Sequence, residues 1–414
     1  MLAPEIAYVV GIAVAKHSHM VCVLQTRTAE VVQRPRTIAA TADGYAALCA
    51  LLQAWGEPTT LLVGLEATGC LWEPLYDALT AAGYTVWVLN PRQTASWATS
   101  LGLRAKTDGL DAQTLARGLL AGYARASTLP AEAVQERRAL TRARRDLVQS
   151  QTAAKQRLRD ELVVLFPEFP EQTPDGCDLF TPAVLHLLER YSSAQALRET
   201  SFEELTVVLQ EVSAGRWGPE QAQALQRLAQ KSAAGTRAVG ARSAVVRTMA
   251  RHLLDLQQRV AELQTAIAAV LAHDEQSKHL RTAPGVGPLI AATVRAELGD
   301  VTRFQNVDQV IAYAGLDPRT RQSGAFVGQK RVSKHGPGAL RHALYLATLV
   351  AVRQRPAWQE RYQRLLDRGR PKKEALTILS RAMLKVLYHL LRTGTSYDPA
   401  AFTAVKPCPA RGRA

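Results

Sequence analysis

The sequence predicts an α/β domain at the amino-terminal end, then a long helical region and a mainly helical third domain. Two observations lead to this prediction. Apolar runs of strand length alternate with helical stretches up to about residue 125, as in a sheet covered on both faces. From about 131 to 280, apolar residues instead recur every three or four positions, which is the helical period. We expect domains at 1–125, 126–280 and 281–400, with a disordered tail at 401–414.

Charge and cysteine content narrow the class of protein. The 414 residues carry a formal net charge of +15. At this size nucleic acid is the polyanion that best explains such an excess, although a basic surface without a dedicated partner would also give it. The five scattered cysteines form neither a metal-ligand spacing nor a disulfide framework, which indicates a reducing cytoplasm. Because no run of about 20 apolar residues occurs, we expect no membrane partner.

The first strand is predicted within Tyr8–Lys16, an apolar run rich in β-branched residues. Met20–Leu24 follows after a short polar break, as in a hairpin, and Glu30–Arg34 is predicted as a third strand. Strand, turn and strand, followed by a helix and further strands, resembles the start of an RNase H-like domain. Such domains hold divalent metal with a carboxylate in the middle of the first strand. Ala13 takes that place here, and its methyl group can hold no metal.

The rest of the first domain continues the alternation of strand and helix. We predict a helix from Thr41, a buried strand at Leu61–Leu65, a helix at Trp72–Ala82, a strand at Thr85–Leu89 and a helix at 108–121. Asn90-Pro91 is interpreted as a break in the chain. An open sheet of this kind carries its site at the strand ends.

Two long helices, at 131–165 and 240–272, are predicted to form an antiparallel pair. The second has a heptad seam, and whether that seam also makes a dimer stays open. Its members are Leu253, Leu256, Val260, Leu263, Ile267 and Val270. Further along, Pro284–Gly287 precedes a predicted helix at 289–298 and resembles a helix-hairpin-helix turn, whose backbone N–H groups contact phosphate. A plain Pro/Gly turn is the alternative.

Three carboxylates of the first domain are candidate metal ligands. Glu66 ends a buried strand, and Asp108 and Asp111 share one face of a helix start. Each alone has a simpler explanation, as a solvated loop residue or as an acid favoured at a helix start. As a set they supply the hard oxygens that divalent cations need. Two Mg²⁺ ions about 4 Å apart can activate and stabilise the oxygens of a phosphodiester.

Motifs across nearly the whole chain resemble one family. Gly11–Lys16, Leu65–Gly69, Asn90-Pro91 and Lys106–Ala112 are together similar to the Asp-Glu-Asp-Asp transposases of the insertion-sequence one-ten family, relatives of the Piv/MooV DNA invertases. Later motifs resemble the C-terminal transposase domain of that family: Pro284–Gly287, Ala312–Arg319, Gln322–Gly324, Ser333–Gly336, Leu340-Arg341 and Ala343–Tyr345.

The resemblance implies an RNA-guided DNA recombinase. A RuvC-like domain with the RNase H fold would hold Mg²⁺, or Mn²⁺ in its place, through Glu66, Asp108 and Asp111. The distant C-terminal domain would supply Ser323 as nucleophile, and the two would form a composite site between protomers of a dimer or tetramer. The guide would be a structured bridge RNA, with one loop pairing to target and the other to donor double-stranded DNA. The expected location is the bacterial cytoplasm, with the nucleoid.

Ser323 lies in a basic stretch, which suits attack on phosphorus. A serine hydroxyl is a poor nucleophile until a base or metal assists it, and nearby cations would neutralise the scissile phosphate. Taken alone, Ser323 would be no more than a turn serine. The predicted nucleic-acid contacts are Lys16, Arg104, Lys106, Arg137, Arg138, Arg142, Arg145, Gly285, Gly287, Arg319, Arg321, Lys330, Arg331, Lys334 and Arg341.

Ala13 departs from the family pattern, which has aspartate there. We therefore expect the chain as written to bind nucleic acid while being catalytically dead or weak. A natural inactive copy or a deliberate substitution would explain the alanine, and we favour the second because every other motif is intact. Two alternative functions remain: a RuvC-like nuclease or resolvase without a serine intermediate, and a non-catalytic nucleic-acid scaffold. An intact Ser323 motif argues against the first, and retention of the three carboxylates argues against the second.

Overall fold

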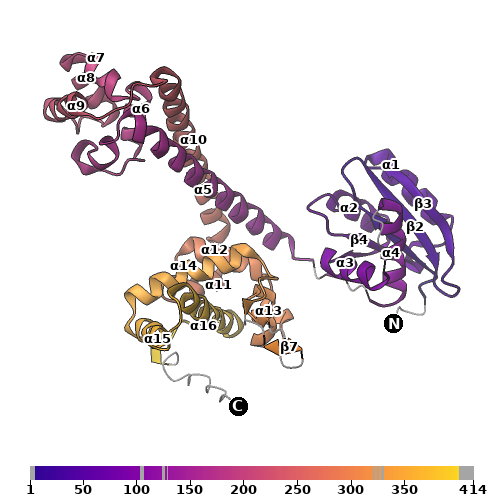
Figure 1. Cartoon of the computed structure of the whole chain (residues 1–414). Coiled ribbons are helices and arrows are strands. Elements are labelled where there is room, and N and C mark those ends of the chain that lie inside the picture. The colour runs from indigo at the N-terminus through magenta and orange to yellow at the C-terminus, as the bar shows by residue number, and fades with distance from the viewer. Residues whose placement is uncertain are drawn as a thin grey trace. The chain divides into compact units, whose positions relative to one another are not determined.

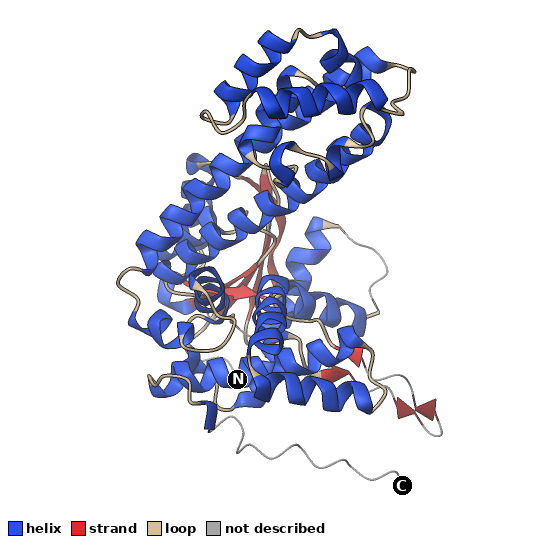
Figure 2. Ribbon diagram, turned by 90° about the vertical axis from the view of Figure 1, so that its left-hand side faces the viewer, coloured by secondary structure: helices blue, strands red, loops and turns tan. Residues whose placement is uncertain are grey.

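The computed structural model describes residues 5–102, 107–123, 126–127, 129–319, 322–323, 326–327 and 331–400. The chain divides into two units, Met1–Leu129 and Pro130–Ala414. Strands and helices alternate in the first unit (Figure 1). The second is mostly helical, and its strands are short pieces (Figure 2). The predicted α/β start and helical remainder are therefore confirmed, whereas the three-domain boundaries stay a prediction and the tail at 401–414 lies outside the described residues.

The first unit is built on a five-stranded sheet of order β3-β2-β1-β4-β5. Strand β2 is antiparallel to both β1 and β3, and β1, β4 and β5 are parallel to one another. This order and these directions are those of an RNase H-like sheet. The elements are β1 (Tyr8–Ala13), β2 (Ser18–Gln25), β3 (Val31–Ala39), α1 (Ala42–Gln53), η1 (Pro58–Thr60), β4 (Leu61–Glu66), α2 (Glu73–Ala81), β5 (Thr85–Leu89), α3 (Pro91–Ser100) and α4 (Asp108–Leu120).

Both faces of this sheet are covered by helices, because side chains alternate along each strand. Val10 and Ile12 of β1 pack in a core with α1 and α2, while Val9 and Ala13 pack in a second core with α4. Gly11 lies on the α4 face, and a Cβ there would be 2.2 Å from the carbonyl oxygen of Ala112. The absence of a side chain at Gly11 thus lets the backbone of α4 lie directly against β1.

Two predictions for this unit need correction. Strand β3 runs from Val31 to Ala39 and is longer than predicted, although it contains Pro35. Asn90-Pro91 does not break the chain but starts α3: the Asn90 side chain accepts from the N–H of Arg92, and Pro91 is the first helical residue. Proline is favoured at that position, because a first-turn N–H has no partner within the helix.

The second unit is organised along two long helices, α5 and α10, which lie side by side (Figure 1). They run antiparallel, as predicted, with Arg242 Nη1 2.7 Å from Glu161 Oε2. Seam residues Leu253, Leu256, Val260 and Ile267 are buried; a dimer through this seam stays a prediction. The elements up to the turn at Pro284 are α5 (Glu132–Leu165), η2 (Phe169–Glu171), η3 (Pro174–Gly176), α6 (Pro182–Arg190), α7 (Ala194–Glu199), α8 (Phe202–Val212), α9 (Pro219–Lys231), α10 (Val239–Leu271) and α11 (Glu275–Arg281).

The remaining helices pack around a separate core that runs from Leu280 to Leu391 in the sequence. Trp358 is fully buried in this C-terminal core. Its elements, with α11, are α12 (Pro288–Leu298), η4 (Val301–Arg303), α13 (Val307–Ala314), β6 (Pro318–Arg319), β7 (Gln322–Ser323), β8 (Phe326–Val327), β9 (Arg331–Val332), α14 (Gly338–Gln354), α15 (Pro356–Asp367) and α16 (Lys372–Thr393). None of the helices in the described ranges is long and apolar enough to cross a membrane.

Candidate active site

Glu66 lies at one end of the sheet, beside Ala13. The paired residues of β1 and β4 end with Ile12 and Leu65, so the next residues along these two parallel strands are Ala13 and Glu66. Side chains alternate along each strand, and Ala13 packs on the α4 face. Glu66 therefore points to the same face. It is half-buried, whereas the residues before it in β4 are buried.

The first turn of α4 carries Asp108 and Asp111, and this helix covers the face of the sheet to which Glu66 points. Thr107 caps the helix, and its hydroxyl accepts from the N–H of Leu110. Ala112 and Leu115 of α4 pack in one core with Ala13. The two aspartates lie one turn before these residues on the same side of the helix. The structure thus places Glu66 beside Ala13, and puts the two aspartates on the helix that covers the same face of the sheet. That the three carboxylates share one metal ion stays a prediction.

Thr94 contacts a predicted site residue, and the sequence interpretation missed it. Its hydroxyl donates to Glu66 Oε1 at 2.7 Å, and it lies on α3, the helix that was interpreted as a chain break. A hydrogen bond of this kind fixes the orientation of a ligating carboxylate. The Asn90-Pro91 pair was the available signal, because it predicts a helix start immediately after β5.

The donor chemistry of this edge fits a hard divalent cation, but the set is one carboxylate short. In the ranges that the structure describes, no three His, Cys, Asp or Glu side chains are grouped as a metal site. Burial raises the pKa of the Cys22 thiol in the same core to about 11. A divalent ion held by Glu66, Asp108 and Asp111 therefore stays a prediction, and the methyl group of Ala13 offers it no further ligand.

Ser323 belongs to the second unit, in a short hairpin. Its backbone pairs with Phe326 across β7 and β8, and the side chains of both strands lie outside the described residues. The base of the hairpin is tied together by hydrogen bonds. The N–H of Ser333 donates to the carbonyl oxygen of Asp317 at 2.9 Å, and its hydroxyl donates to the Asp317 carboxylate. The structure thus describes how the hairpin is anchored, and the nucleophilic role of Ser323 stays a prediction.

Arg341, a predicted nucleic-acid contact, has a structural role at this base. Its Nη1 donates to the carbonyl oxygens of Ala314 and Gly336, the latter at 2.6 Å. Gly315 has a φ of 66°, and a Cβ there would lie 2.6 Å from the backbone nitrogen of Gly336. Two glycine-containing turns therefore cross closely at this point, and Arg341 holds them together.

Arg138 and Arg142 are also used structurally. Arg142 Nε and Nη2 donate to the two carboxylate oxygens of Glu297 at 2.8 and 2.9 Å, and the Glu297 side chain is fully buried. Arg138 donates to the backbone carbonyl oxygen of Ala296 at 3.2 Å. The hydrogen bond to Glu297 raises the pKa of Arg142. Part of the predicted nucleic-acid cluster therefore joins α5 to α12.

The other predicted nucleic-acid contacts vary in their surroundings. Lys16 and Lys334 are exposed, and Arg145 forms an ion pair with the neighbouring Asp146. Half-buried Arg137 lies near Asp274. Burial opposes ionisation of Asp274, but the hydrogen bond from Arg295, with a smaller contribution from the charge of Arg137, lowers its pKa. Arg104, Lys106, Arg321 and Lys330 lie outside the described residues, as do the side chains of Arg319 and Arg331.

The glycine-rich turn before α12 packs against a helix. A Cβ at Gly285 would lie 2.2 Å from the carbonyl oxygen of Ala347 in α14, and the φ of Gly285 is 76°. Close packing alone therefore accounts for this glycine. Gly287 is exposed at the start of α12, and phosphate binding by the turn stays a prediction.

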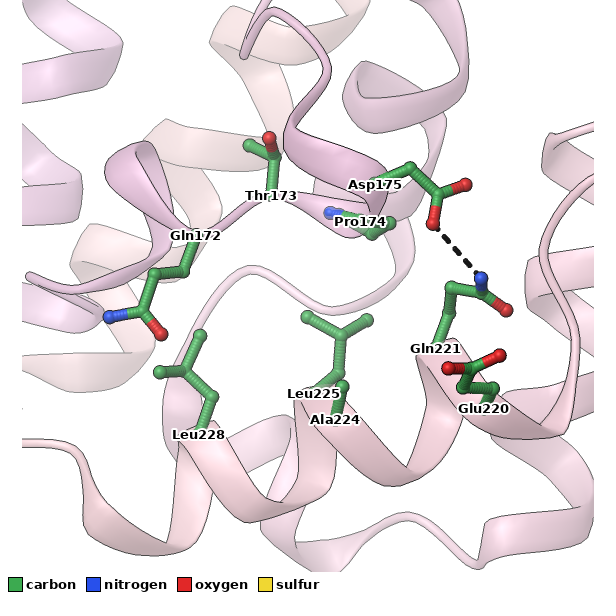
Figure 3. Close-up of a pocket in the computed structure, with 9 residues that line it drawn as sticks. All are labelled: Gln172, Thr173, Pro174, Asp175, Glu220, Gln221, Ala224, Leu225 and Leu228. Carbon is green, nitrogen blue, oxygen red and sulfur yellow. Dashed lines mark hydrogen bonds between the residues drawn. The ribbon is translucent and has the colours of Figure 1, made fainter.

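A pocket among the shorter helices contains none of the predicted site residues. It encloses about 270 Å³ between η3 and α9, where Gln221 Nε2 donates to Asp175 Oδ1 at 2.9 Å (Figure 3). Gln221 also accepts from the N–H of Gly218 and so caps α9. These two contacts join η3 to the start of α9, and they do not point to a ligand.

The fold and site define a class of protein. An RNase H-like sheet with a carboxylate such as Glu66 at a strand end is typical of metal-dependent enzymes that act on nucleic-acid phosphodiesters. Family comparisons agree with this class. A transposase family, the DEDD transposase of IS110, matches residues 10–167, and a second, the transposase of the IS116/IS110/IS902 family, matches residues 277–363.

The chain belongs to the IS110 family of transposases. It is 30% identical over 296 residues to an uncharacterised 43.6 kDa protein of insertion element IS110 from Streptomyces coelicolor, covering 71% of this chain and 72% of that protein. It is 23% identical over 392 residues to the pilin gene-inverting protein of Moraxella bovis, covering 94% and 97%. Among solved structures, RuvC from T. thermophilus in complex with a Holliday junction substrate is 15% identical, with a TM-score of 0.21, over 29% of this chain and 99% of that one.

Proposed function

We propose that this transposase is an RNA-guided DNA recombinase that cuts and rejoins donor and target DNA through a serine–phosphate intermediate. The observation that carries the proposal is the position of Glu66 at a strand end beside Ala13, on the face of the sheet that α4 covers. The RNA guide is what the family resemblance implies, and the formal charge of +15 suits such a partner. A dimer or tetramer, located with the nucleoid, belongs to the same proposal.

In the proposed reaction Ser323 Oγ attacks the scissile phosphorus. The Oγ–P bond forms as the bond from phosphorus to the 3′ oxygen breaks; the hydroxyl proton passes to a base, and the 3′ oxygen gains a proton. The product pair is a phosphoserine and a free 3′ hydroxyl, which conserves bond energy for rejoining. Basic residues of the same stretch, including Arg319 and Arg331, would neutralise the phosphate.

Glu66, Asp108 and Asp111 would hold divalent metal, Mg²⁺ or Mn²⁺, which supplies positive charge next to the oxygens of the phosphodiester. Thr94 orients Glu66 for this role. Because Ala13 contributes no oxygen, we propose that the chain as written assembles with nucleic acid but cleaves slowly or not at all.

Replacing the proposed nucleophile tests the serine step. In a chain with Ala13→Asp, the further change Ser323→Ala should abolish both strand exchange and the covalent protein–DNA adduct. DNA binding should survive, because backbone contacts hold the base of the hairpin. Denaturing gel electrophoresis of end-labelled DNA measures the adduct, and Ser333→Ala in the same loop region is a control for local damage. A denaturation-resistant adduct formed by the Ser323→Ala chain would place the nucleophile elsewhere. DNA cleavage by the Ser323→Ala chain without any adduct would favour the nuclease alternative.

A further inference from the structure

The C-terminal core contains a groove that the proposed reaction does not use. It encloses about 570 Å³ and lies between α15, α16 and the segment that follows α16. Small-ligand sites in proteins are typically about 300–1,000 Å³, so the groove could hold one or two nucleotides.

The floor of the groove is apolar. Ala382, Val386 and Leu390 line it, and their spacing of four residues places them in one stripe along α16. Leu390 is buried and the other two are half-buried. An apolar stripe of this kind can contact the face of a planar ring.

The rim of the groove is basic. Lys385 and His389 are exposed one turn apart on α16, and half-buried Arg361 lines the groove from α15. Among the lining residues, Asp398 is the acid, and its Oδ1 accepts from the N–H of Ala400 at 2.8 Å. The lining is therefore net positive, and it complements an anion attached to an apolar body.

The wall opposite α16 is held in place by contacts outside the groove. The Tyr397 hydroxyl lies 3.3 Å from Nε1 of the buried Trp358, and the Tyr397 N–H donates to Thr282 Oγ1 at 2.8 Å. The groove thus exists before any ligand arrives, which lowers the entropic cost of binding.

We propose that this groove binds an unpaired nucleotide, with the base against the floor and the phosphate at Lys385, His389 and Arg361. An apolar slot with a basic rim matches a nucleotide, whose faces are apolar and whose backbone is anionic. The proposal rests on the proposed function, in which nucleic acid is the ligand. It adds a contact in the C-terminal core for a strand that is not base-paired, in DNA or in RNA.

Fluorescence anisotropy of the full-length chain with labelled hexanucleotides tests the groove. Lys385→Glu should weaken binding about tenfold, whereas Lys373→Glu, at an exposed site on α16 outside the groove, should have little effect. A hexamer lacking its bases should bind the unmodified chain about tenfold more weakly than a normal one. Parallel DNA and RNA hexamers show which strand is preferred.

Equal loss of affinity in both lysine variants, or equal binding of the normal and abasic hexamers, would reduce the groove to a general basic surface and overturn the proposal. If Lys385→Glu leaves hexamer affinity unchanged but alters sedimentation, the groove is a contact between copies of the chain. In each of these cases the Ser323 adduct in the Ala13→Asp chain would still form, so the proposed function would stand without the groove.

Discussion

Ala13 is the residue on which we expect the activity of this chain to depend most. It is 8% exposed, lies beside Glu66 and packs in one core with α4. Ala13→Asp should restore Mg²⁺-dependent DNA cleavage. Losing a metal that stabilises the attacking or leaving oxygen costs several kcal/mol, so the gain should be on the order of a thousandfold or more. Single-turnover cleavage assays measure it.

The matched control for this change is Ala13→Asn, which adds similar volume without a carboxylate. It should recover far less activity, because a neutral amide oxygen is a weaker ligand for Mg²⁺ than a carboxylate. Recombination by the unaltered chain at the rate of its Ala13→Asp version would refute the metal-site argument.

Thr94 should control the metal affinity of the restored site. In the Ala13→Asp chain, Thr94→Val keeps the shape of the side chain but removes the donor to Glu66 Oε1. Loss of such a supporting hydrogen bond typically costs about 10- to 100-fold in metal affinity or activity. A Mg²⁺ titration of the cleavage rate should show a matching rise in half-saturation. Thr99→Val, which removes a hydroxyl bonded within the same helix to Ala95, should leave the titration unchanged.

The candidate site shows which residues a sequence can reveal. The strand that carries Glu66 and the helix that carries Asp108 and Asp111 were predictable from local pattern, while the role of these residues as metal ligands stays a prediction. The hydrogen bond from Thr94 to Glu66 was not predicted, since it depends on a helix start that was interpreted as a break. A contact between residues 28 apart in the chain has no local pattern, and it becomes visible only when α3 is folded next to β4.

At the scale of elements, the ion pair between α5 and α12 should contribute strongly to stability. Arg142→Ala would leave the fully buried Glu297 carboxylate without its main partner. Breaking a buried pair in this way costs about 3–5 kcal/mol; Arg138, 3.9 Å away, should keep the loss near the lower figure. Urea unfolding followed by the fluorescence of Trp358 and the other tryptophans measures it.

A double variant separates the ion pair from simple packing. Adding Glu297→Met to Arg142→Ala removes the buried charge, so part of the lost stability should return. Arg145→Ala, at a surface pair with Asp146, should change the free energy of unfolding by less than about 0.5 kcal/mol. Equal destabilisation by Arg142→Ala and Arg145→Ala would mean that the Arg142–Glu297 ion pair contributes little to the free energy of unfolding.

The ion pair between α5 and α12 also shows why the arginine cluster was predicted as a nucleic-acid surface. In the sequence, Arg138 and Arg142 stand in a run where arginines outnumber the nearby carboxylates, Glu136 and Asp146. Their partner, Glu297, lies 155 residues after Arg142, inside an apolar helix where a buried acid is not expected. Charge clustering alone cannot distinguish cations that face solvent from cations that balance a buried acid.

For the whole molecule, we expect RNA binding that weakens steeply with salt. Each phosphate neutralised by Lys or Arg releases counterions, giving a slope of about −0.9 per phosphate for duplex DNA and about −0.7 for single strands. Filter binding of the full-length chain to structured RNA, measured from low to moderate salt, should therefore give a steep line of log affinity against log salt. A slope near zero would count against RNA as a partner of this +15 chain.

The fold itself was largely predictable at this scale. Continuous apolar runs such as Leu61–Leu65 identify buried strands of a covered sheet, and the spacing of Leu253, Leu256 and Val260 identifies the long helix α10. The extent of β3 was not predictable, because polar residues and Pro35 interrupt its pattern while its pairing with β2 keeps it extended. The extent of β3 is therefore set by its pairing with β2 and not by the local propensity of its residues.

The paired helices α5 and α10 fix the distance between the short helices α6–α9 and the C-terminal core. At a rise of about 1.5 Å per residue, the 34 residues of α5 span about 50 Å. A deletion in one helix alone would put its side chains out of step with those of its neighbour. Relatives that differ in this length should therefore have gained or lost residues in both helices together, in multiples of about seven, which keep the same faces in contact. Insertions and deletions in this region should thus occur in pairs, one in each helix. Each such pair should move the short helices α6–α9 nearer to or farther from the C-terminal core.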